Sequence, residues 1–136
     1  MLQVPASILD ELVAHLAAGL PDEACGLLGG RSSDEGVCTV DAWYPSDNVA
    51  ASSRIYTIDP RTHLRADRDA EDRGAELVGV VHSHTHSEPV PSPTDIAQAP
   101  DPTWHYVIVS FRLGAPMVRS WRLEGEVVTE EPVVVV

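Results

Sequence analysis

Three side chains of types that commonly bind metal ions stand close together in the second half of the sequence. His82 and His84 are separated by one residue, and Asp95 follows eleven positions after His84. Two histidines at this spacing on a β-strand point to the same side of the strand, so both imidazoles can reach one ion. A loop that folds back after them can bring the Asp95 carboxylate to the same place. Two imidazoles, one carboxylate and an open fourth position are typical of catalytic zinc, which lowers the pKa of a bound water to about 7 and so provides hydroxide at neutral pH.

A water activated in this way also needs a group that takes up its proton and passes it to the leaving group. Glu23 stands directly before the apolar stretch "ACGLLGG" and is the candidate for this general acid and base, with Asp22 as the alternative. The residues "SPTD", from Ser92 to Asp95, are also typical of a helix capping box. Both interpretations can hold together, because Ser92 can cap a helix while Asp95 binds a metal ion.

The strands that must position these residues predict a mixed sheet. The nearly continuous apolar run 76–84 indicates a central strand covered on both faces, and this strand ends at His84. Further strands are expected over residues 24–30, 36–45, 55–59, 104–111, 116–123 and 126–136. A tight hairpin at Glu124 and Gly125 should join the last two.

Three helices are expected around this sheet. The first begins at a capping box formed by Ser7 and Asp10 and ends near residues 19–21. The second is capped by Asp59 and runs to about Gly74, and the third covers residues 92–99. Because strands and helices are mixed without strict alternation, we predict an α/β fold with a single mixed β-sheet flanked by helices.

Length and composition limit the classes of protein that this chain can belong to. The 136 residues suit a single domain, residues 1–136, and the 43% of hydrophobic residues can form a core. A formal net charge of -12 repels phosphate backbones, which argues against a nucleic-acid partner. No segment approaches the roughly 20 apolar residues that cross a bilayer, and the first residues do not resemble a signal peptide. We therefore expect a cytoplasmic protein without a membrane partner.

The order His-x-His, seven residues, Ser, two residues, Asp, with an upstream glutamate, resembles the signature of the JAMM (MPN+) zinc metalloproteases. The resemblance implies a mixed α/β fold akin to that of cytidine deaminases and one zinc ion per chain. It also implies hydrolysis of amide or isopeptide bonds at the C-terminus of ubiquitin-like proteins. In this family pattern His82, His84 and Asp95 match the zinc ligands. Glu23 then matches the general acid and base, and Ser92 the hydroxyl that steadies the oxyanion.

The stretches "PDEACGLL", "HSHT" and "TEEPV" are similar to a stand-alone bacterial branch of this family, the sulfur-carrier-protein hydrolases. This similarity implies release of cysteine from the C-terminal Gly-Gly tail of a small ubiquitin-like sulfur-carrier protein, a step in cysteine biosynthesis. Two alternatives are an isopeptidase that removes ubiquitin-like modifiers from protein lysines, and an inactive scaffold of the same fold. A zinc deaminase is excluded, because its Pro-Cys-x-x-Cys motif is absent.

Other reactive residue types have structural explanations. We expect His15, His63 and His105 to be structural, and Cys25 to be a buried thiol. As a fourth protein ligand, His86 would close the metal site and make the zinc structural. We instead place His86 in the loop, facing solvent or substrate.

Two expectations concern contacts with other chains. The terminal "PVVVV" can pair with a strand of its own sheet or with a second subunit, which would make a homodimer. Because many ubiquitin-like carriers are acidic, we expect their recognition to depend on local arginines such as Arg54.

Overall fold

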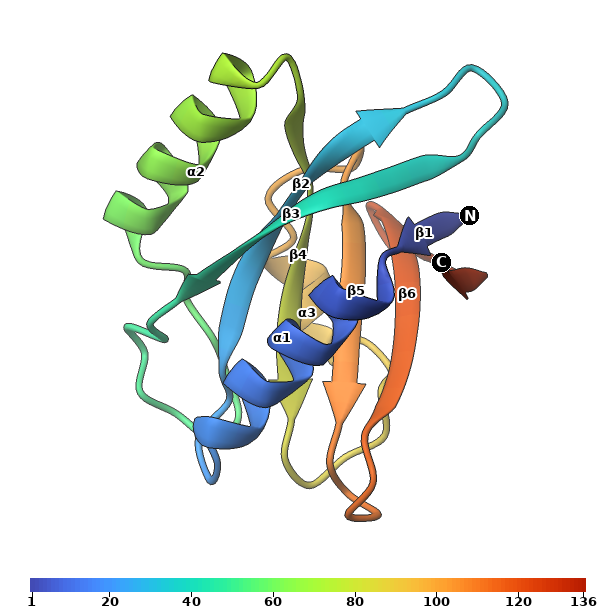
Figure 1. The fold of residues 1–136 in the computed structure, drawn as a ribbon. Helices are drawn as coiled ribbons and strands as arrows, with labels where there is room; N and C mark the ends of the chain where they lie inside the picture. Colours follow the sequence, from blue (N-terminus) through green and yellow to red (C-terminus); the bar gives the residue numbers. More distant parts are fainter.

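Eight strands in one mixed sheet, with three helices around it, make up the computed structural model, which describes all residues 1–136 (Figure 1). The strands are β1 (Leu2–Val4), β2 (Cys25–Ser32), β3 (Cys38–Ser46), β4 (Glu76–His84), β5 (His105–Ser110), β6 (Met117–Glu124), β7 (Val127–Glu131) and β8 (Val133–Val135). The helices are α1 (Ala6–Ala18), α2 (Pro60–Asp72) and α3 (Pro93–Ala97). The predicted fold class, a mixed sheet flanked by helices, is confirmed.

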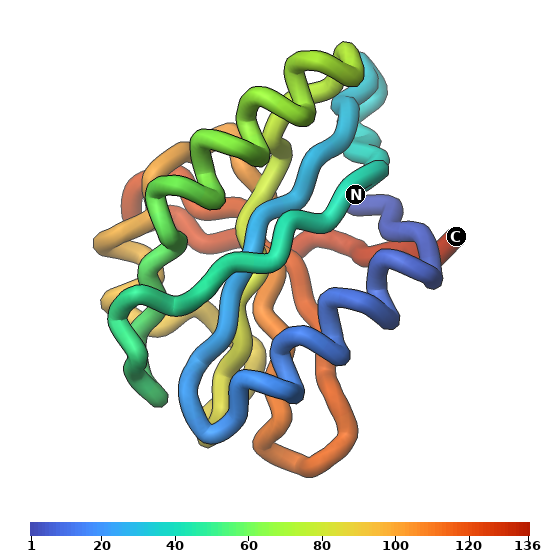
Figure 2. The backbone as a smooth tube through the Cα atoms, turned by 60° about the vertical axis from the view of Figure 1, so that its left-hand side comes forward, coloured from blue at the N-terminus to red at the C-terminus, as the bar shows by residue number.

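The order of strands across the sheet is β7-β6-β5-β4-β2-β3-β1-β8, which places β4 near the middle. β4 pairs with β2 in the antiparallel sense and with β5 in the parallel sense. Both faces of β4 are covered, as its apolar sequence predicts. Val81 belongs to the buried cluster that contains Leu12 of α1, whereas Val80 belongs to a second cluster that contains Ala66 of α2. The two long helices therefore cover opposite faces of the sheet (Figures 1 and 2).

The C-terminal segment joins the two edges of the sheet. β7 pairs with β6 at one edge, and after the single residue Pro132 the chain continues as β8, which pairs with β1 at the other edge. The N–H of Leu2 donates to the carbonyl of Pro132 at 2.9 Å. Because one residue separates the two edge strands, the sheet must curl until its edges meet.

Glu131 is the buried polar residue at this closure. Its carboxylate accepts hydrogen bonds from Nδ1 of His105 at 2.6 Å and from the hydroxyl of Ser120 at 2.9 Å, and it pairs with the amino group of Met1 at 3.2 Å. Burial alone raises the pKa of Glu131, but the hydrogen bonds and the charge of His105 outweigh burial and lower this pKa below its ordinary value. The expectation that His105 is structural agrees with this contact.

Several sequence-based boundaries differ from the structure. The predicted capping box at Ser7 is wrong: α1 begins at Ala6 after Pro5, whose backbone already adopts φ -57° and which makes no side-chain cap. Residues 55–59 are not a strand and contribute one isolated bridge, between Asn48 and Ile58. The predicted final strand is divided in two at Pro132, because proline has no N–H for a sheet hydrogen bond.

The hairpin between the last long strands is confirmed. Glu124 of β6 pairs with Val127 of β7, and Gly125 has the positive φ of 61° that such a turn requires. The terminal valines pair with β1 of the same chain, so the sheet-internal alternative is the one observed. A homodimer stays a prediction. No helix combines the length and the apolar character that crossing a membrane requires.

Replacing Glu131 with glutamine is expected to lower the free energy of unfolding at pH 7 by about 1–3 kcal/mol, because buried hydrogen-bond donors lose a charged acceptor. Since the pKa of Glu131 is lowered in the folded protein, its carboxylate stabilises the fold fully above its ordinary pKa of 4.5, and this contribution is lost as the pH falls through the folded-state value. The difference between the two proteins should therefore shrink in acid. Urea unfolding at pH 7 and below pH 4.5 measures both effects.

The matched control is Glu130→Gln, which changes an exposed neighbour whose ion pair with Arg119 is 3.7 Å long. This variant should lie within about 0.5 kcal/mol of the wild type. Equal stability of the Glu130 and Glu131 variants at pH 7 would contradict the role given to Glu131.

Candidate metal centre

The two histidines of the metal pattern come from the end of the central strand. In β4, His82 lies between Cys25 of β2 and Ile108 of β5. His82 and His84 are both buried and point to the same face, as their spacing predicts. Ser83 points to the other face, where its hydroxyl accepts the N–H of Ala24 at 2.9 Å. This contact ties the end of β4 to the residue that follows Glu23.

Asp95 reaches the histidines because it begins the short helix α3. Ser92 is the N-cap of this helix, and its hydroxyl accepts the N–H of Asp95 at 3.0 Å. In return, Oδ2 of Asp95 accepts the N–H of Ser92 at 2.8 Å. These two bonds are the predicted capping box, and they hold the carboxylate in one orientation.

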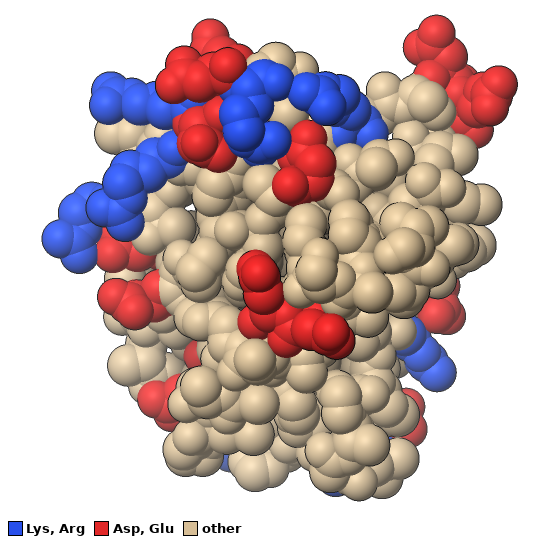
Figure 3. Space-filling model, viewed as in Figure 1, with Lys and Arg blue, Asp and Glu red and all other residues tan.

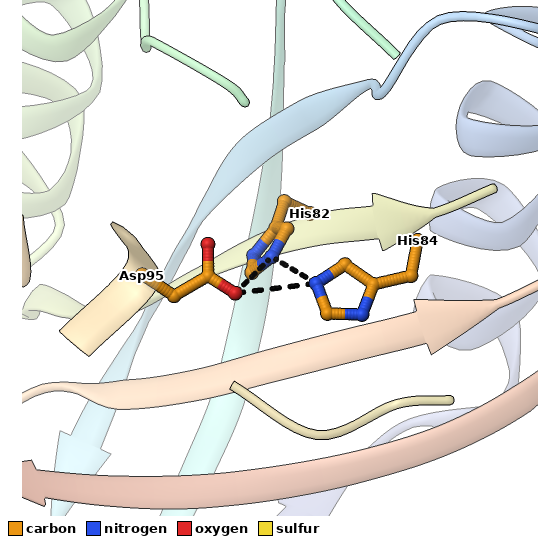
Figure 4. Close-up of side chains that lie close together, drawn as sticks. All are labelled: His82, His84 and Asp95. Carbon is orange, nitrogen blue, oxygen red and sulfur yellow. Dashed lines mark hydrogen bonds and ion pairs between the residues drawn. The ribbon is translucent and has the colours of Figure 1, made fainter. Parts of the chain in front are cut away.

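The three candidate ligands meet at the point where these elements converge (Figure 4). Nε2 of His82 lies 3.1 Å from Nε2 of His84, and both nitrogens lie 3.2 Å from Oδ2 of Asp95. The ligand atoms of the three residues all lie within 4.8 Å of one another. The structure thus brings together the residues that the sequence pattern predicts.

The chemistry of this donor set fits a cation. Nδ1 of His84 lies 2.7 Å from the carbonyl of Glu88, which can only accept, so Nδ1 carries the proton and Nε2 of the neutral ring presents a lone pair. This lone pair faces Oδ2 of Asp95 and Nε2 of His82. Electron-rich atoms at such short distances repel one another unless a positive charge lies among them. The three residues could therefore hold a metal ion.

Electrostatic shifts favour the metal-binding forms of His82 and Asp95, but the protonated form of His84. Burial lowers the pKa of His82, which favours the neutral imidazole. Burial also opposes the ionisation of Asp95, but hydrogen bonds with His82 and His84 outweigh it and lower the pKa of this carboxyl far below its ordinary value. For His84, burial lowers the pKa, but the hydrogen bonds with Asp95 and with the carbonyl of Glu88 raise it above its ordinary value.

Glu23 lies beside this centre, just before β2. Its N–H donates to the carbonyl of Ser52 at 2.8 Å, and its own carbonyl accepts the side-chain amide of Asn48 at 2.9 Å. The side chain is buried, and Oε1 has no hydrogen-bond partner in the protein. Burial raises the pKa of Glu23 to about 7. The charge of His84 lowers this pKa and that of Asp95 raises it, and both effects are smaller than that of burial. A carboxyl group with this pKa is suited to proton transfer near neutral pH, whereas Asp22 is exposed.

Two contacts at the centre were not predicted from the sequence. The ring of Tyr56 stacks on that of His82, with centroids 4.2 Å apart and an angle of 17° between the planes. Nδ1 of His82 is buried and has no hydrogen-bond partner, so outside the ligand cluster it is the stacked Tyr56 that orients this ring. The second contact is the carbonyl of Glu88 on His84. Neither contact can be predicted from the sequence. Any residue can supply a backbone carbonyl, and Tyr56 is distant from β4 along the chain.

The remaining reactive residues lie outside the centre. Burial raises the pKa of the Cys25 thiol to about 12, so this cysteine is a poor nucleophile. His15 contacts the carbonyls of Cys25 and Ser46, which is the structural role expected for it. His86 is exposed and is not among the three clustered ligands.

Comparison with known protein families identifies the group to which this site belongs. The model of the prokaryotic homologues of the JAB domain matches residues 5–124, which include every candidate site residue. The chain belongs to the prokaryotic JAB (JAMM/MPN) family. The predicted family resemblance is confirmed, and the chain is a hydrolase of the JAMM type.

Three relatives are similar over most of their length. A CysO-cysteine peptidase of Mycobacterium tuberculosis is 39% identical over all of this chain and 92% of its own. A desampylase of Haloferax volcanii is 38% identical over 80% of both chains. A Thermus thermophilus protein named "Probable TtuB-protein conjugate cleaving protease" is 36% identical over 93% of this chain and 79% of its own.

Two solved structures share the fold. A solution structure of a Desulfitobacterium hafniense protein has a TM-score of 0.88 at 33% identity and covers 100% of this chain and 93% of its own. A JAB1/MPN domain protein of Archaeoglobus fulgidus has a TM-score of 0.64 at 22% identity over 98% of both chains, which shows the fold alone.

The stacking contact leads to a prediction about metal affinity. Tyr56→Leu is expected to weaken metal binding roughly tenfold, because His82 loses the ring that stacks on it and its Nδ1 has no hydrogen bond that would hold the imidazole in place. Tyr56→Phe keeps the stacked ring and serves as the control, with an affinity close to that of the wild type. Competition with a chromophoric chelator measures the dissociation constant of each protein for Zn²⁺. Equal affinities of the leucine variant and the wild type would contradict the orienting role.

Proposed function

We propose that this chain is a zinc-dependent hydrolase that cleaves the amide bond after the C-terminal glycine of a ubiquitin-like sulfur-carrier protein and releases cysteine. It would act in the cytoplasm, as a step of cysteine biosynthesis. The observation that carries the proposal is the 39% identity, over the entire chain, with a CysO-cysteine peptidase.

Zinc is the metal that the donor set favours. Two imidazole nitrogens and one carboxylate oxygen, from His82, His84 and Asp95, make up the three protein ligands that catalytic zinc sites commonly have. Each ligand is constrained from outside the cluster: His82 by Tyr56, His84 by the carbonyl of Glu88, and Asp95 by the N–H of Ser92. Such support is typical of metal sites with a fixed geometry.

The chain's own residues can carry out the proton transfers of amide hydrolysis. When bound, zinc supplies Lewis acidity that polarises the scissile carbonyl and acidifies water. Glu23 takes the proton from the water as the water oxygen attacks the carbonyl carbon, and it then gives this proton to the nitrogen of the leaving amine as the C–N bond breaks. The raised pKa of Glu23, about 7, supports both steps, because the group can bind and release a proton at neutral pH.

Ser92 is proposed to stabilise the oxyanion that develops during this attack. Its hydroxyl oxygen accepts the N–H of Asp95, and no protein acceptor takes its proton. The hydroxyl can therefore cap α3 and still donate a hydrogen bond to the substrate. The capping bond holds the oxygen beside Asp95, and so close to the candidate metal centre.

The second candidate function is removal of ubiquitin-like modifiers from protein lysines. The desampylase and the Thermus protein, at 38% and 36% identity, favour this alternative. Both functions use the same site and differ in what lies beyond the scissile bond. An inactive scaffold is disfavoured, because the chain retains the clustered ligands together with Glu23 and Ser92.

One assay separates the two enzyme functions. The purified, zinc-loaded protein is incubated with a CysO–cysteine adduct and, separately, with the same carrier joined to a protein lysine, and both reactions are followed by mass spectrometry. We expect release of free cysteine at a rate at least tenfold higher than release of the lysine-linked protein. Cleavage of the lysine conjugate alone would refute the cysteine-releasing function.

Glu23→Gln is expected to lower kcat by a factor of roughly 10²–10⁴, because the amide cannot accept the proton of the water. Its zinc content should remain that of the wild type, since the three clustered ligands are unchanged. Asp22→Asn is the matched control, as it changes the neighbouring exposed carboxylate and should keep wild-type activity. Steady-state kinetics and elemental analysis of the same preparations test both statements, and substantial turnover by the glutamine variant would remove Glu23 from the mechanism.

A further inference from the structure

The side chain of Asn48 uses all of its hydrogen-bonding capacity inside the protein. Its amide nitrogen donates to the carbonyl of Glu23 at 2.9 Å and to the carbonyl of Ile55 at 3.0 Å. Its oxygen Oδ1 accepts the N–H of Ala50 at 3.1 Å and the N–H of Thr57 at 2.9 Å. A carboxamide has two N–H donors and two acceptor lone pairs, so all four are occupied.

These bonds join the segment that carries Glu23 to the irregular loop 47–58. At the base of the loop, Asn48 forms an isolated antiparallel bridge with Ile58. The loop also meets Glu23 through its backbone, because the N–H of Glu23 donates to the carbonyl of Ser52 at 2.8 Å. Both backbone polar groups of Glu23 are thus bonded to the loop, and the carboxamide supplies the bond to its carbonyl.

The same loop contributes to the candidate metal centre. Tyr56, whose ring stacks on that of His82, lies between Ile55 and Thr57. The carboxamide of Asn48 bonds the backbone of both these neighbours, at the carbonyl of one and the N–H of the other. One side chain therefore holds the backbone of the proposed proton carrier and the segment that places a ring against a candidate ligand.

Asn48 holds the Glu23 segment without adding charge to it. Glu23 takes part in none of the ion pairs of the protein. Most of the basic side chains visible in Figure 3 lie along α2 and the nearby ends of β2 and β3, whereas β4 ends in the lower part of the same view. A basic side chain in the place of Asn48 would favour the ionised carboxyl of Glu23 and lower its pKa.

We propose that Asn48 is a positioning residue of this enzyme, whose carboxamide fixes the backbone of Glu23 and the loop that carries Tyr56 relative to each other. The inference rests on the proposed function, in which Glu23 transfers protons beside the metal centre. Hydrolysis depends on this placement, because a displacement of about 1 Å at a reacting group can lower the rate on the order of 10²-fold.

Asn48→Asp and Asn48→Ala test this role. Aspartate can still accept the N–H of Ala50 and of Thr57, and so keeps the turn, but it cannot donate to the carbonyl of Glu23. The substrate is the CysO–cysteine adduct or the lysine conjugate, whichever the wild type cleaves faster. At the pH of maximal activity of each zinc-saturated protein, kcat of both variants is expected to fall about tenfold or more. Val49→Asp is the matched control, since it adds the same charge at an exposed neighbour and should keep kcat within about twofold.

A double-mutant cycle separates positioning from a general loss of structure. If Asn48 acts through Glu23, Asn48→Ala should lower the residual kcat of Glu23→Gln by less than about twofold, because the carboxyl group that it positions is already absent. A general loss of structure would lower kcat by the same factor in both backgrounds. Urea unfolding identifies the conditions under which each variant is folded. Equal factors in the cycle, or wild-type kcat in Asn48→Asp, would overturn the positioning role.

Metal affinity tests the inference without hydrolysis. Because the loop carries Tyr56, Asn48→Ala should weaken Zn²⁺ binding roughly tenfold, and adding this change to Tyr56→Leu should weaken it by less than a further factor of about two. If the wild type cleaves neither substrate, the proposed function fails, whereas these affinities still test Asn48. Zn²⁺ binding by Asn48→Ala as tight as that of the wild type would overturn the link between Asn48 and the metal centre.

Discussion

Oδ2 of Asp95 accepts the N–H of Ser92 and faces Nε2 of both His82 and His84, and the rest of the site is arranged around this atom. The capping bond fixes the carboxylate before any metal binds, so the protein bears the cost of ordering this ligand on folding. Because the same short helix carries Ser92, a single turn places both a ligand and a hydroxyl at the centre. A metal ion would relieve the repulsion among the converging donor atoms.

The sheet supplies the rigid frame for that arrangement. β4 lies near the middle, with paired strands on both sides and a helix over each face, so the ends of its side chains cannot shift far. The two edges of the sheet meet through Pro132. At this closure the carboxylate of Glu131 accepts hydrogen bonds from His105 and Ser120. The central strand β4 thus carries the two histidines at its end, and buried apolar residues before them stabilise the core.

The pKa values of two buried carboxylates at this centre are shifted in opposite directions, although burial raises both. Asp95 is kept ionised by its hydrogen bonds with the histidines, whereas Glu23 has an oxygen without a partner and a pKa raised to about 7. This divergence separates a ligand from a proton carrier although both are acidic side chains beside one centre.

The sequence by itself determined the types of the ligands, the shared face of His82 and His84, the capping box at Ser92 and the family, because each depends on residue identity and on short, regular spacing. It also determined the central strand and the two-faced core through an apolar run. Only the tertiary structure decided that Tyr56 stacks on His82 and that one residue closes the sheet. The short strand β1 and the irregular segment 55–59 likewise escaped prediction. Such contacts join residues far apart in the chain, and their geometry follows from how the sheet curls and packs, which no local pattern of residues encodes.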